Sequence, residues 1–162
     1  MLSSRIAPLL FLLLLANGTP LLARKVLGQR CSFPIDRDHL FLDGRPLFGP
    51  AKTLRGVVCA LSATTAGGFL VGVGWKIGLL VGGLAMVGDL FSSFVKRRLG
   101  RAPSTPFLGI DQIPESLFPL IACMRPLSLT IADIALGVAV FFVGELALSR
   151  VLYAFALRER PY

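Results

Sequence analysis

Histidine is nearly absent from this 162-residue chain, which contains one, and cysteine occurs only three times. With His39 alone, the sequence offers little for a histidine-rich metal site or a Ser-His-Asp triad. Cys31, Cys59 and Cys123 are odd in number, widely spaced and without a C-x-x-C pattern, so they support neither a disulfide framework nor a zinc site. Charge is also scarce, since 16% of the residues are charged and 54% are hydrophobic.

The abundant hydrophobic residues stand in long blocks and do not alternate with polar ones. Blocks of about 20 residues match the hydrocarbon thickness of a bilayer. Backbone groups in lipid must be satisfied internally, which favours helices over strands. The sequence therefore predicts an all-α fold, a polytopic transmembrane helical bundle in which residues 1–162 form a single integral-membrane domain. About five spans are expected, at residues 6–23, 57–75, 77–95, 107–124 and 129–152.

Basic residues predict how these spans are oriented. Fourteen of them belong to the two longer loops and the C-terminus, namely Arg24, Lys25, Arg30, Arg37, Arg45, Lys52, Arg55, Lys96, Arg97, Arg98, Arg101, Arg150, Arg158 and Arg160. Only Arg5, Lys76 and Arg125 lie on the other side. The positive-inside rule thus places the loops at about residues 24–56 and 96–106 and the C-terminus in the cytoplasm, with the N-terminus outside the cell membrane. The net charge of +8 needs no nucleic acid to explain it, because topology and anionic lipid headgroups suffice.

The first hydrophobic block has an alternative interpretation. Arg5 precedes the apolar run "LLFLLLLA", as it would in a secretory signal peptide. No clear A-x-A cleavage site follows, so a retained helix is the preferred interpretation.

Glycines recur at four-residue spacing in the second and third blocks, at Gly68 and Gly72 and at Gly74, Gly78 and Gly82. Small residues at this spacing let helices approach closely. We therefore expect tight packing between the second and third helices, and the same pattern leaves a homodimer open.

An acid inside a hydrophobic block singles out one region of the chain. On a helix, Asp89, Ser92, Ser93 and Lys96 share one face, because they lie at offsets of three, four and seven residues. An aspartate near mid-membrane costs roughly 2.5–3.5 kcal/mol on translocon scales, and such residues usually mark a function. Asp111 stands at the other end of the basic loop, and two carboxylates with a phosphate suit Mg²⁺. The alternative is a structural charge pair of Asp89 with Lys96 or a nearby arginine.

The first loop ends in a second group of candidate residues. The stretch "GRPLFGPAKT" departs from a Walker A loop, because two residues separate its last glycine from Lys52. Lys52, Thr53, Arg55 and Gly56 nevertheless lie where the loop meets the second helix, and they offer phosphates two cations, a hydroxyl group and a close backbone. A basic anchor at the level of the lipid headgroups explains the same residues equally well.

Three stretches together resemble the CDP-archaeol synthase family, small relatives of the CDP-diacylglycerol synthases (phosphatidate cytidylyltransferases). They are "PIDRDHLFLDGRPLFGPAKTLRG", "GDLFSSFVKRRLG" and "FLGIDQI", which cover both predicted cytoplasmic loops in the family's order. The resemblance implies a membrane-embedded enzyme that transfers CMP from CTP to a lipid phosphate, either archaetidic-acid-like or phosphatidic acid. It also implies Mg²⁺ dependence and catalysis at the cytoplasmic face, with release of pyrophosphate.

The resemblance also implies roles for individual residues. Asp89 and Asp111 correspond to the metal-binding acids, and Lys96 and Arg97 to the basic pair beside the nucleotide phosphates. The "KTLRG" stretch, residues 52–56, matches a loop motif that also meets phosphate. The "DGR" stretch, residues 43–45, matches the family as well, and no role is assigned to it.

One position departs from the family pattern. Where the family reads Asp-Gln-Leu-Asp, this chain reads Asp111, Gln112, Ile113 and Pro114, with Glu115 next. Either Glu115 replaces the lost acid as a metal ligand, or the site has one ligand fewer. The missing acid favours a catalytically inactive lipid-binding protein on the same scaffold as the alternative to an enzyme. A small transporter component is a further alternative, which predicts acids spread along a pore.

Overall fold

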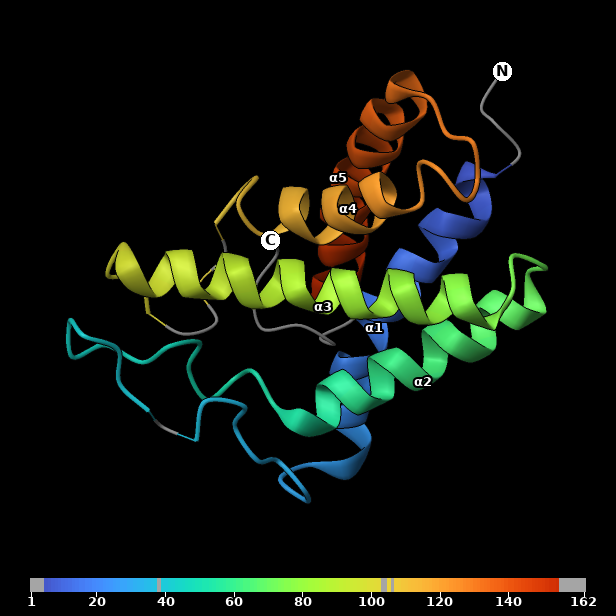
Figure 1. Ribbon diagram of the computed structural model, residues 1–162. Helices are drawn as coiled ribbons and strands as arrows, with labels where there is room; N and C mark the ends of the chain where they lie inside the picture. The colour runs from blue at the N-terminus through green and yellow to red at the C-terminus, as the bar shows by residue number, and fades with distance from the viewer. Residues whose placement is uncertain (1–4, 38, 103–104, 106, 155–162) are drawn as a thin grey trace.

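The computed structural model describes residues 5–37, 39–102, 105 and 107–154, with side chains through residue 150. These residues form five α-helices and no strand (Figure 1). The helices are α1 (Ile6–Leu27), α2 (Leu54–Leu70), α3 (Trp75–Arg98), α4 (Gln112–Ala122) and α5 (Ile131–Ala154). The predicted all-α bundle is therefore confirmed.

The five helices differ in whether they can cross a bilayer. Within the described residues, three are long and apolar enough to do so, at Ile6–Leu27, Trp75–Arg98 and Ile131–Arg150. Helix α2 is apolar but has 17 residues, and α4 has only 11. At about 1.5 Å per residue, α4 is about 16 Å long, roughly half the hydrocarbon core of a bilayer. The fourth predicted span, residues 107–124, thus contains a helix too short to cross the core by itself.

The number and direction of the membrane crossings stay predictions. Two of the basic residues used for the C-terminal orientation, Arg158 and Arg160, lie outside the described residues. Many large hydrophobic side chains are exposed along the helices, as lipid-facing side chains would be, among them Phe69, Leu70 and Val143.

Helices α2 and α3 approach so closely that glycine is required between them. A Cβ atom at Gly78 would lie 2.2 Å from the carbonyl oxygen of Thr64, and one at Gly82 would lie 2.0 Å from its hydroxyl oxygen. No side chain fits at either position, so the backbone of α3 rests directly on α2. The predicted close packing of these helices is confirmed at Gly68, Gly78 and Gly82, whereas Gly72 and Gly74, at φ +78° and +90°, lie in the turn between the two helices.

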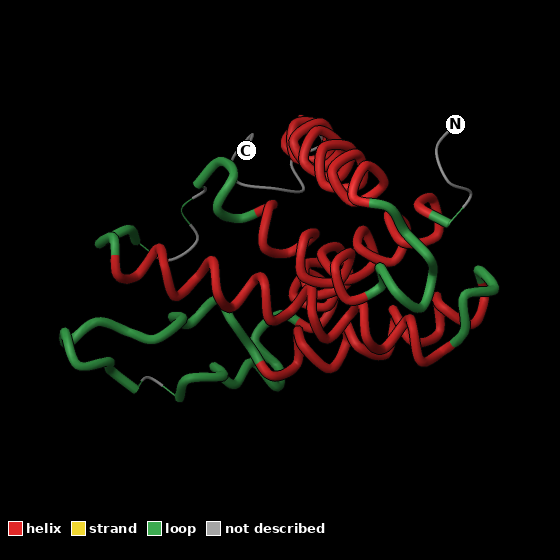
Figure 2. The backbone as a smooth tube through the Cα atoms, turned by 45° about the horizontal axis from the view of Figure 1, so that its top comes forward, coloured by secondary structure: helices red, strands yellow, loops and turns green. Residues whose placement is uncertain are grey.

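A buried apolar core joins residues of all five helices, Ala60 of α2 among them. Its fully buried members include Leu9, Leu12 and Leu13 of α1, Ala85 of α3 and Leu120 of α4. Turned by 45°, the molecule shows the long first loop extending from one end of the bundle (Figure 2). In Figure 1 this loop lies beside the C-terminal end of α3, and the segment that follows α3 returns over the same end. Both loops that carry predicted site residues therefore meet at one place.

Candidate active site

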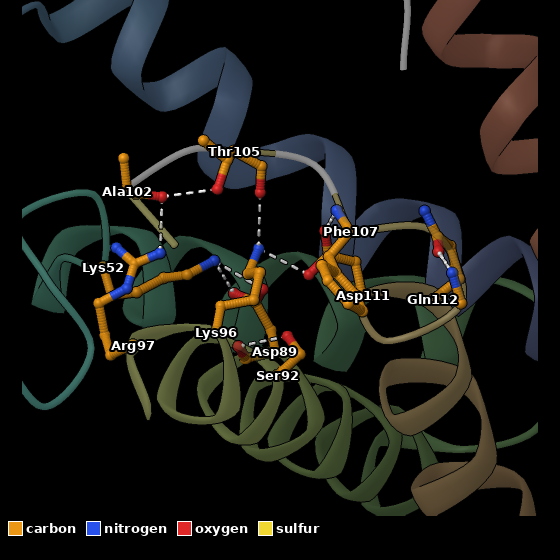
Figure 3. A network of polar contacts seen from close by, with 11 residues as sticks. Lys52, Asp89, Ser92, Lys96, Arg97, Ala102, Thr105, Phe107, Asp111 and Gln112 are labelled. Carbon is orange, nitrogen blue, oxygen red and sulfur yellow. Dashed lines mark hydrogen bonds and ion pairs between the residues drawn. The ribbon is translucent and has the colours of Figure 1, made fainter. Parts of the chain in front are cut away.

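The C-terminal half of α3 carries the first pair of charged side chains. Nζ of Lys52 donates hydrogen bonds to both carboxylate oxygens of Asp89, at 2.6 and 2.7 Å (Figure 3). Lys52 lies at the end of the first loop, 37 residues before its partner. From the sequence, the structural partner considered for Asp89 was Lys96 or a nearby arginine, and this was wrong. The loop folds back along α3, which a one-helix pattern cannot indicate.

Lys52 is surrounded by negative charge. Burial lowers its pKa, but the charge of Asp89 and its hydrogen bond, followed by the charges of Glu115 and Asp111, raise the pKa above its ordinary value. The three acids predicted as metal ligands thus act on one ammonium group, although they come from two helices and the turn before α4.

Lys96 forms the second charged pair. Its Nζ lies 2.6 Å from Oδ1 of Asp111 and donates a hydrogen bond to the carbonyl oxygen of Thr105 at 3.3 Å. The other carboxylate oxygen of Asp111 accepts a hydrogen bond from the backbone N–H of Phe107 at 3.0 Å. The segment after α3 is therefore folded back so that the two ends of the basic loop touch (Figure 3).

Arg97 lies beside this pair and is only 3% exposed. Its Nη2 donates a hydrogen bond to the carbonyl oxygen of Ala102 at 2.7 Å. Its Nε and Nη1 are buried and have no hydrogen-bond partner in the part of the chain that the structure describes. A buried guanidinium with unused donors is suited to a phosphate, which accepts several hydrogen bonds at once.

The altered family position lies where α3 touches α4. A Cβ atom at Gly88 would lie 2.4 Å from the carbonyl oxygen of Pro114, so the two backbones meet one residue before Asp89. Pro114 fits in the first turn of α4, where backbone N–H groups have no partner within the helix. Glu115 follows, is 4% exposed, and its Oε1 has no hydrogen-bond partner among the described residues. Glu115 thus brings an unsatisfied carboxylate oxygen into the interior beside Asp89.

A cavity of about 330 Å³ opens beside the Lys52–Asp89 pair, between α1, the first loop, α2 and α3. Thr53 lines it and also caps α2, because its hydroxyl oxygen accepts a hydrogen bond from the N–H of Gly56 at 3.2 Å. Arg55 lines the cavity as well, and its Nη1 donates to the carbonyl oxygens of Gly28 and Arg30. The role of Arg55 visible in the structure is therefore to fasten the chain that follows α1.

Arg24 is a cationic residue of this cavity that the sequence analysis did not predict as a site residue. Arg24 lines the cavity together with Pro20, which lies one helical turn earlier on the same face of α1. The sequence analysis counted Arg24 only as a topology signal. Its four-residue spacing from a proline was the one available hint.

The described residues do not form a conventional metal cluster. No three His, Cys, Asp or Glu side chains within the described ranges lie together closely enough to hold a metal ion. Instead, Asp89 and Asp111 each face a lysine ammonium group at 2.6 Å. The site is thus two lysine–aspartate pairs, a buried arginine and a buried glutamate at one end of the bundle.

Known proteins share this sequence and architecture. The family model for CarS-like CDP-archaeol synthases matches residues 71–162, the part that carries Asp89, Lys96, Arg97 and Asp111. The CDP-archaeol synthase of Sulfurisphaera tokodaii is 32% identical over 135 residues, covering 80% of this chain and 81% of that protein. The chain belongs to the CDP-archaeol synthase family. The resemblance noted from the sequence is therefore confirmed.

Two further relatives support the same assignment over nearly the whole length. The CDP-archaeol synthase of Pyrobaculum calidifontis is 32% identical over 162 residues, covering 94% of this chain and 96% of that protein. A solved structure, described as an intramembrane enzyme for archaeal membrane lipids biosynthesis, has a TM-score of 0.67 and 28% identity. The match covers 85% of this chain and 90% of that one. The likeness extends to the fold and identifies the chain as a membrane protein.

Proposed function

We propose that this protein transfers CMP from CTP to a lipid phosphate, giving a CDP-lipid and pyrophosphate. As a member of the CDP-archaeol synthase family, the chain is a CTP-dependent nucleotidyltransferase. The observation that carries the proposal is the convergence of two lysine–aspartate pairs and the buried Arg97 at one end of α3. Such a cluster offers both the cations that bind a triphosphate and the acids that suit a divalent ion.

The reaction itself needs little covalent participation from the protein. An oxygen of the lipid phosphate attacks the α-phosphorus of CTP, and the bond from that phosphorus to the pyrophosphate oxygen breaks. No covalent enzyme intermediate is required, so catalysis consists of positioning the two substrates and stabilising charge. From the family resemblance, the proposed acceptor is an archaetidic-acid-like lipid or phosphatidic acid.

The paired lysines supply the nucleotide-binding charge. Lys52 and Lys96 hold Asp89 and Asp111 in the structure, and we expect both ammonium groups to turn to phosphate oxygens when CTP binds. Arg97 needs no such rearrangement, because its Nε and Nη1 have no partner in the described structure. Thr53 and Arg55 lie in the adjoining cavity, where they can contact a phosphate from a second direction.

Mg²⁺ is the proposed cofactor, because carboxylate oxygens and substrate phosphates are the ligands that it prefers. Asp89 and Asp111 would hold it, with Glu115 as the third carboxylate in place of the acid that Pro114 removed. The unpartnered Oε1 of Glu115 is consistent with this role, and Mg²⁺ commonly uses one or two carboxylates together with waters and substrate phosphates. When bound, the ion neutralises phosphate charge and makes the α-phosphorus more electrophilic.

The active face is proposed to be cytoplasmic. Four basic residues gather at the end of α3 and just beyond it, and the positive-inside rule places that end in the cytoplasm. A topology reporter fused after Arg101 should therefore report the cytoplasm, and one fused after Lys76 should report the outside. The opposite result would place the site on the other face of the membrane and remove its access to cytoplasmic CTP.

The transfer can be tested with purified protein, CTP labelled in the α-phosphate, Mg²⁺ and a panel of lipid phosphates. We expect the label to enter the lipid, with one pyrophosphate released per CDP-lipid formed. The panel should include an unsaturated archaeal-type ether lipid phosphate and phosphatidic acid. Lipid binding without transfer to any member would instead favour the inactive lipid-binding alternative. A homodimer stays a prediction, which light scattering of the detergent-solubilised protein would test.

A further inference from the structure

The tip of the first loop, residues 40–47, docks on the last turn of α3. Leu40 and Pro46 form an antiparallel bridge, and the N–H of Phe41 donates to the carbonyl oxygen of Arg45 at 2.8 Å. The N–H of Arg45 in turn donates to Oδ1 of Asp43 at 3.1 Å. These bonds close the tip into a compact turn, which presents Asp43 and Arg45 to α3.

Arg98, the last residue of α3, grips this turn from the helix side. Its Nη1 pairs with Oδ1 of Asp43, and its Nη2 donates to the carbonyl oxygen of Pro46 at 2.6 Å. The guanidinium also lies 4.7 Å from the ring centroid of Phe41 and 5.0 Å from that of Phe94. A planar guanidinium can make all these contacts at once, whereas an ammonium group cannot.

Arg45 grips α3 from the loop side. Its Nη1 donates to the carbonyl oxygens of Arg98 at 2.8 Å and Arg97 at 3.2 Å. The last carbonyl groups of a helix have no partner within the helix, so Arg45 satisfies two of them. Gly100, at φ +71°, passes close by, since a Cβ atom there would lie 3.4 Å from Nη1 of Arg45. We call the three residues Asp43, Arg45 and Arg98 the arginine clasp.

The clasp and the Lys52–Asp89 pair fasten the same loop to the same helix at two points. Arg98 and Asp89 are nine residues apart, about 13 Å along a helix. Between the two points the loop is stiffened by Asp36, whose Oδ2 accepts hydrogen bonds from the N–H groups of Phe48 and Gly49 at 3.0 and 2.8 Å. At the Lys52 end, the N–H of Ile35 donates to the carbonyl oxygen of Lys52 at 2.9 Å, so the segment from the clasp to Lys52 is held at both ends.

The arginine clasp and the Lys52–Asp89 pair should respond differently when a nucleotide binds. The proposed function requires Lys52 to leave Asp89 for a phosphate, so that contact is exchanged during binding. The clasp is made of backbone carbonyl oxygens, aromatic rings and an ion pair at the far side of the tip, and Asp43 and Arg98 do not line the cavity. The clasp can thus stay closed while the Lys52 contact opens.

We propose that Asp43, Arg45 and Arg98 are positioning residues for the transfer reaction: they fix the first loop on the end of α3, so that Lys52 stays within reach of the nucleotide phosphates after it leaves Asp89. This inference rests on the proposed function, because it takes Lys52 as a phosphate contact. It assigns a role to the "DGR" stretch, for which the sequence suggested none.

The test compares Arg45→Lys and Arg98→Lys, which keep the charge and lose the fork and the stacking. Arg37→Lys is the matched control, because Arg37 lies in the same loop, is exposed, and makes no side-chain hydrogen bond or ion pair with α3. Each variant is assayed for the KM for CTP and for kcat, for CTP affinity by equilibrium binding, and for thermal unfolding. Nitroxide labels at two exposed positions, Leu42 on the tip and Leu99 after α3, report the distance between loop and helix in protein whose cysteines have been replaced.

We expect a narrow label distance in the wild type and in Arg37→Lys, and a broad distribution in both clasp variants. The KM for CTP and its dissociation constant should rise about tenfold in the clasp variants, the scale expected for a contact worth about 1.4 kcal/mol, while kcat changes less than about twofold. A purely structural role would lower the unfolding temperature and the active fraction and would leave KM unchanged.

Two outcomes would overturn the inference. A narrow label distance in both clasp variants would show that the clasp does not hold the loop. A broad distance with unchanged CTP affinity would show that the loop position does not matter for the nucleotide. If the wild type binds CTP but transfers nothing, the proposed function fails, and label distance with CTP affinity still decides the inference.

Discussion

The two halves of α3 hold their neighbours by different means. The N-terminal half packs directly on α2 through Gly78 and Gly82, where a single added carbon would collide with Thr64. The C-terminal half touches the backbone of α4 at Gly88 and is otherwise held by charged and hydrogen-bonded side chains, among them the Lys52–Asp89 pair and the arginine clasp. The N-terminal half of α3 is therefore fixed in the bundle by packing, and its C-terminal half presents the charged residues of the candidate site.

This difference explains where the site lies. When a backbone-to-backbone contact opens, no other group takes the place of the lost neighbour, so its packing energy is lost. A partly exposed ion pair is worth little net free energy, and a phosphate can replace one of its members at small cost. Substrate can enter at the polar end of α3 without disturbing the packing that holds the bundle together.

Asp89→Asn should give the largest effect on transfer activity. It should change only the charged C-terminal half of α3 and leave the helix packing intact. It keeps the size of the side chain and removes its charge, so CTP-dependent transfer should fall at least ~100-fold, the loss seen when a main electrostatic contributor is removed. Membrane insertion and thermal unfolding should change little, because Lys52 is partly exposed and can be solvated. The measurement is transfer from labelled CTP together with a melting curve.

Asp133→Asn is the matched control for that change. Asp133 is an acid on α5 that accepts hydrogen bonds from Thr130 and lies far along the chain from the site. It should lose some stability and no activity. Near-normal transfer by a well-folded Asp89→Asn variant would contradict the assignment of Asp89 as a metal ligand. Asp89 would then be a member of a structural charge pair.

The two halves also differ in how well the sequence predicts them. The glycine spacing of α3 predicts its packing on α2, because both features arise from the regular geometry of one helix. The shared face of Asp89 and Lys96 follows from the same regularity. The partners of these residues do not, since Lys52 and Asp111 arrive on loops whose path has no period. Two residues of the clasp, Asp43 and Arg45, lie in the quoted "DGR" stretch, which stayed without a role for the same reason.

Gly78→Ala should break the apolar half. The added carbon would lie 2.2 Å from the carbonyl oxygen of Thr64, so α2 and α3 must separate, which costs about 1–3 kcal/mol by analogy with overpacked cores. Gly83→Ala is the control on the same helix, because its nearest neighbour is a flexible leucine methyl at 3.9 Å. We expect that variant to be neutral or stabilised by up to about 1 kcal/mol through helix propensity.

Thermal unfolding in detergent, with transfer measured per folded molecule, checks this pair of variants. The folded fraction of Gly78→Ala should keep near-normal transfer, since the polar half is untouched. Equal melting temperatures for Gly78→Ala and Gly83→Ala would contradict the glycine contact described above.

Glu115→Gln tests whether the buried glutamate replaces the acid that Pro114 removed. If it does, the Mg²⁺ concentration for half-maximal transfer should rise about tenfold, a loss of about 1.4 kcal/mol in apparent metal binding. Asp111→Asn is the reference, and the two variants should be weakened to a similar degree. A nearly silent Glu115→Gln beside a severe Asp111→Asn would instead make Glu115 a structural residue of α4. Titration of transfer with Mg²⁺ separates the two results.

Thr53→Ala should give the smallest effect. Thr53 lies between the packed helices and the charged residues of the candidate site. Thr53 begins a packing helix, where its hydroxyl oxygen caps the N–H of Gly56, and it also lines the cavity beside Asp89. Loss of an N-cap costs about 1 kcal/mol, so the melting temperature should fall slightly in Thr53→Ala and stay unchanged in Thr53→Ser. If the hydroxyl also binds phosphate, the KM for CTP or for the lipid should rise in Thr53→Ala and be restored in Thr53→Ser. A lowered melting temperature with both KM values unchanged would assign Thr53 to the packing region alone, and the border of the site would then lie at Lys52.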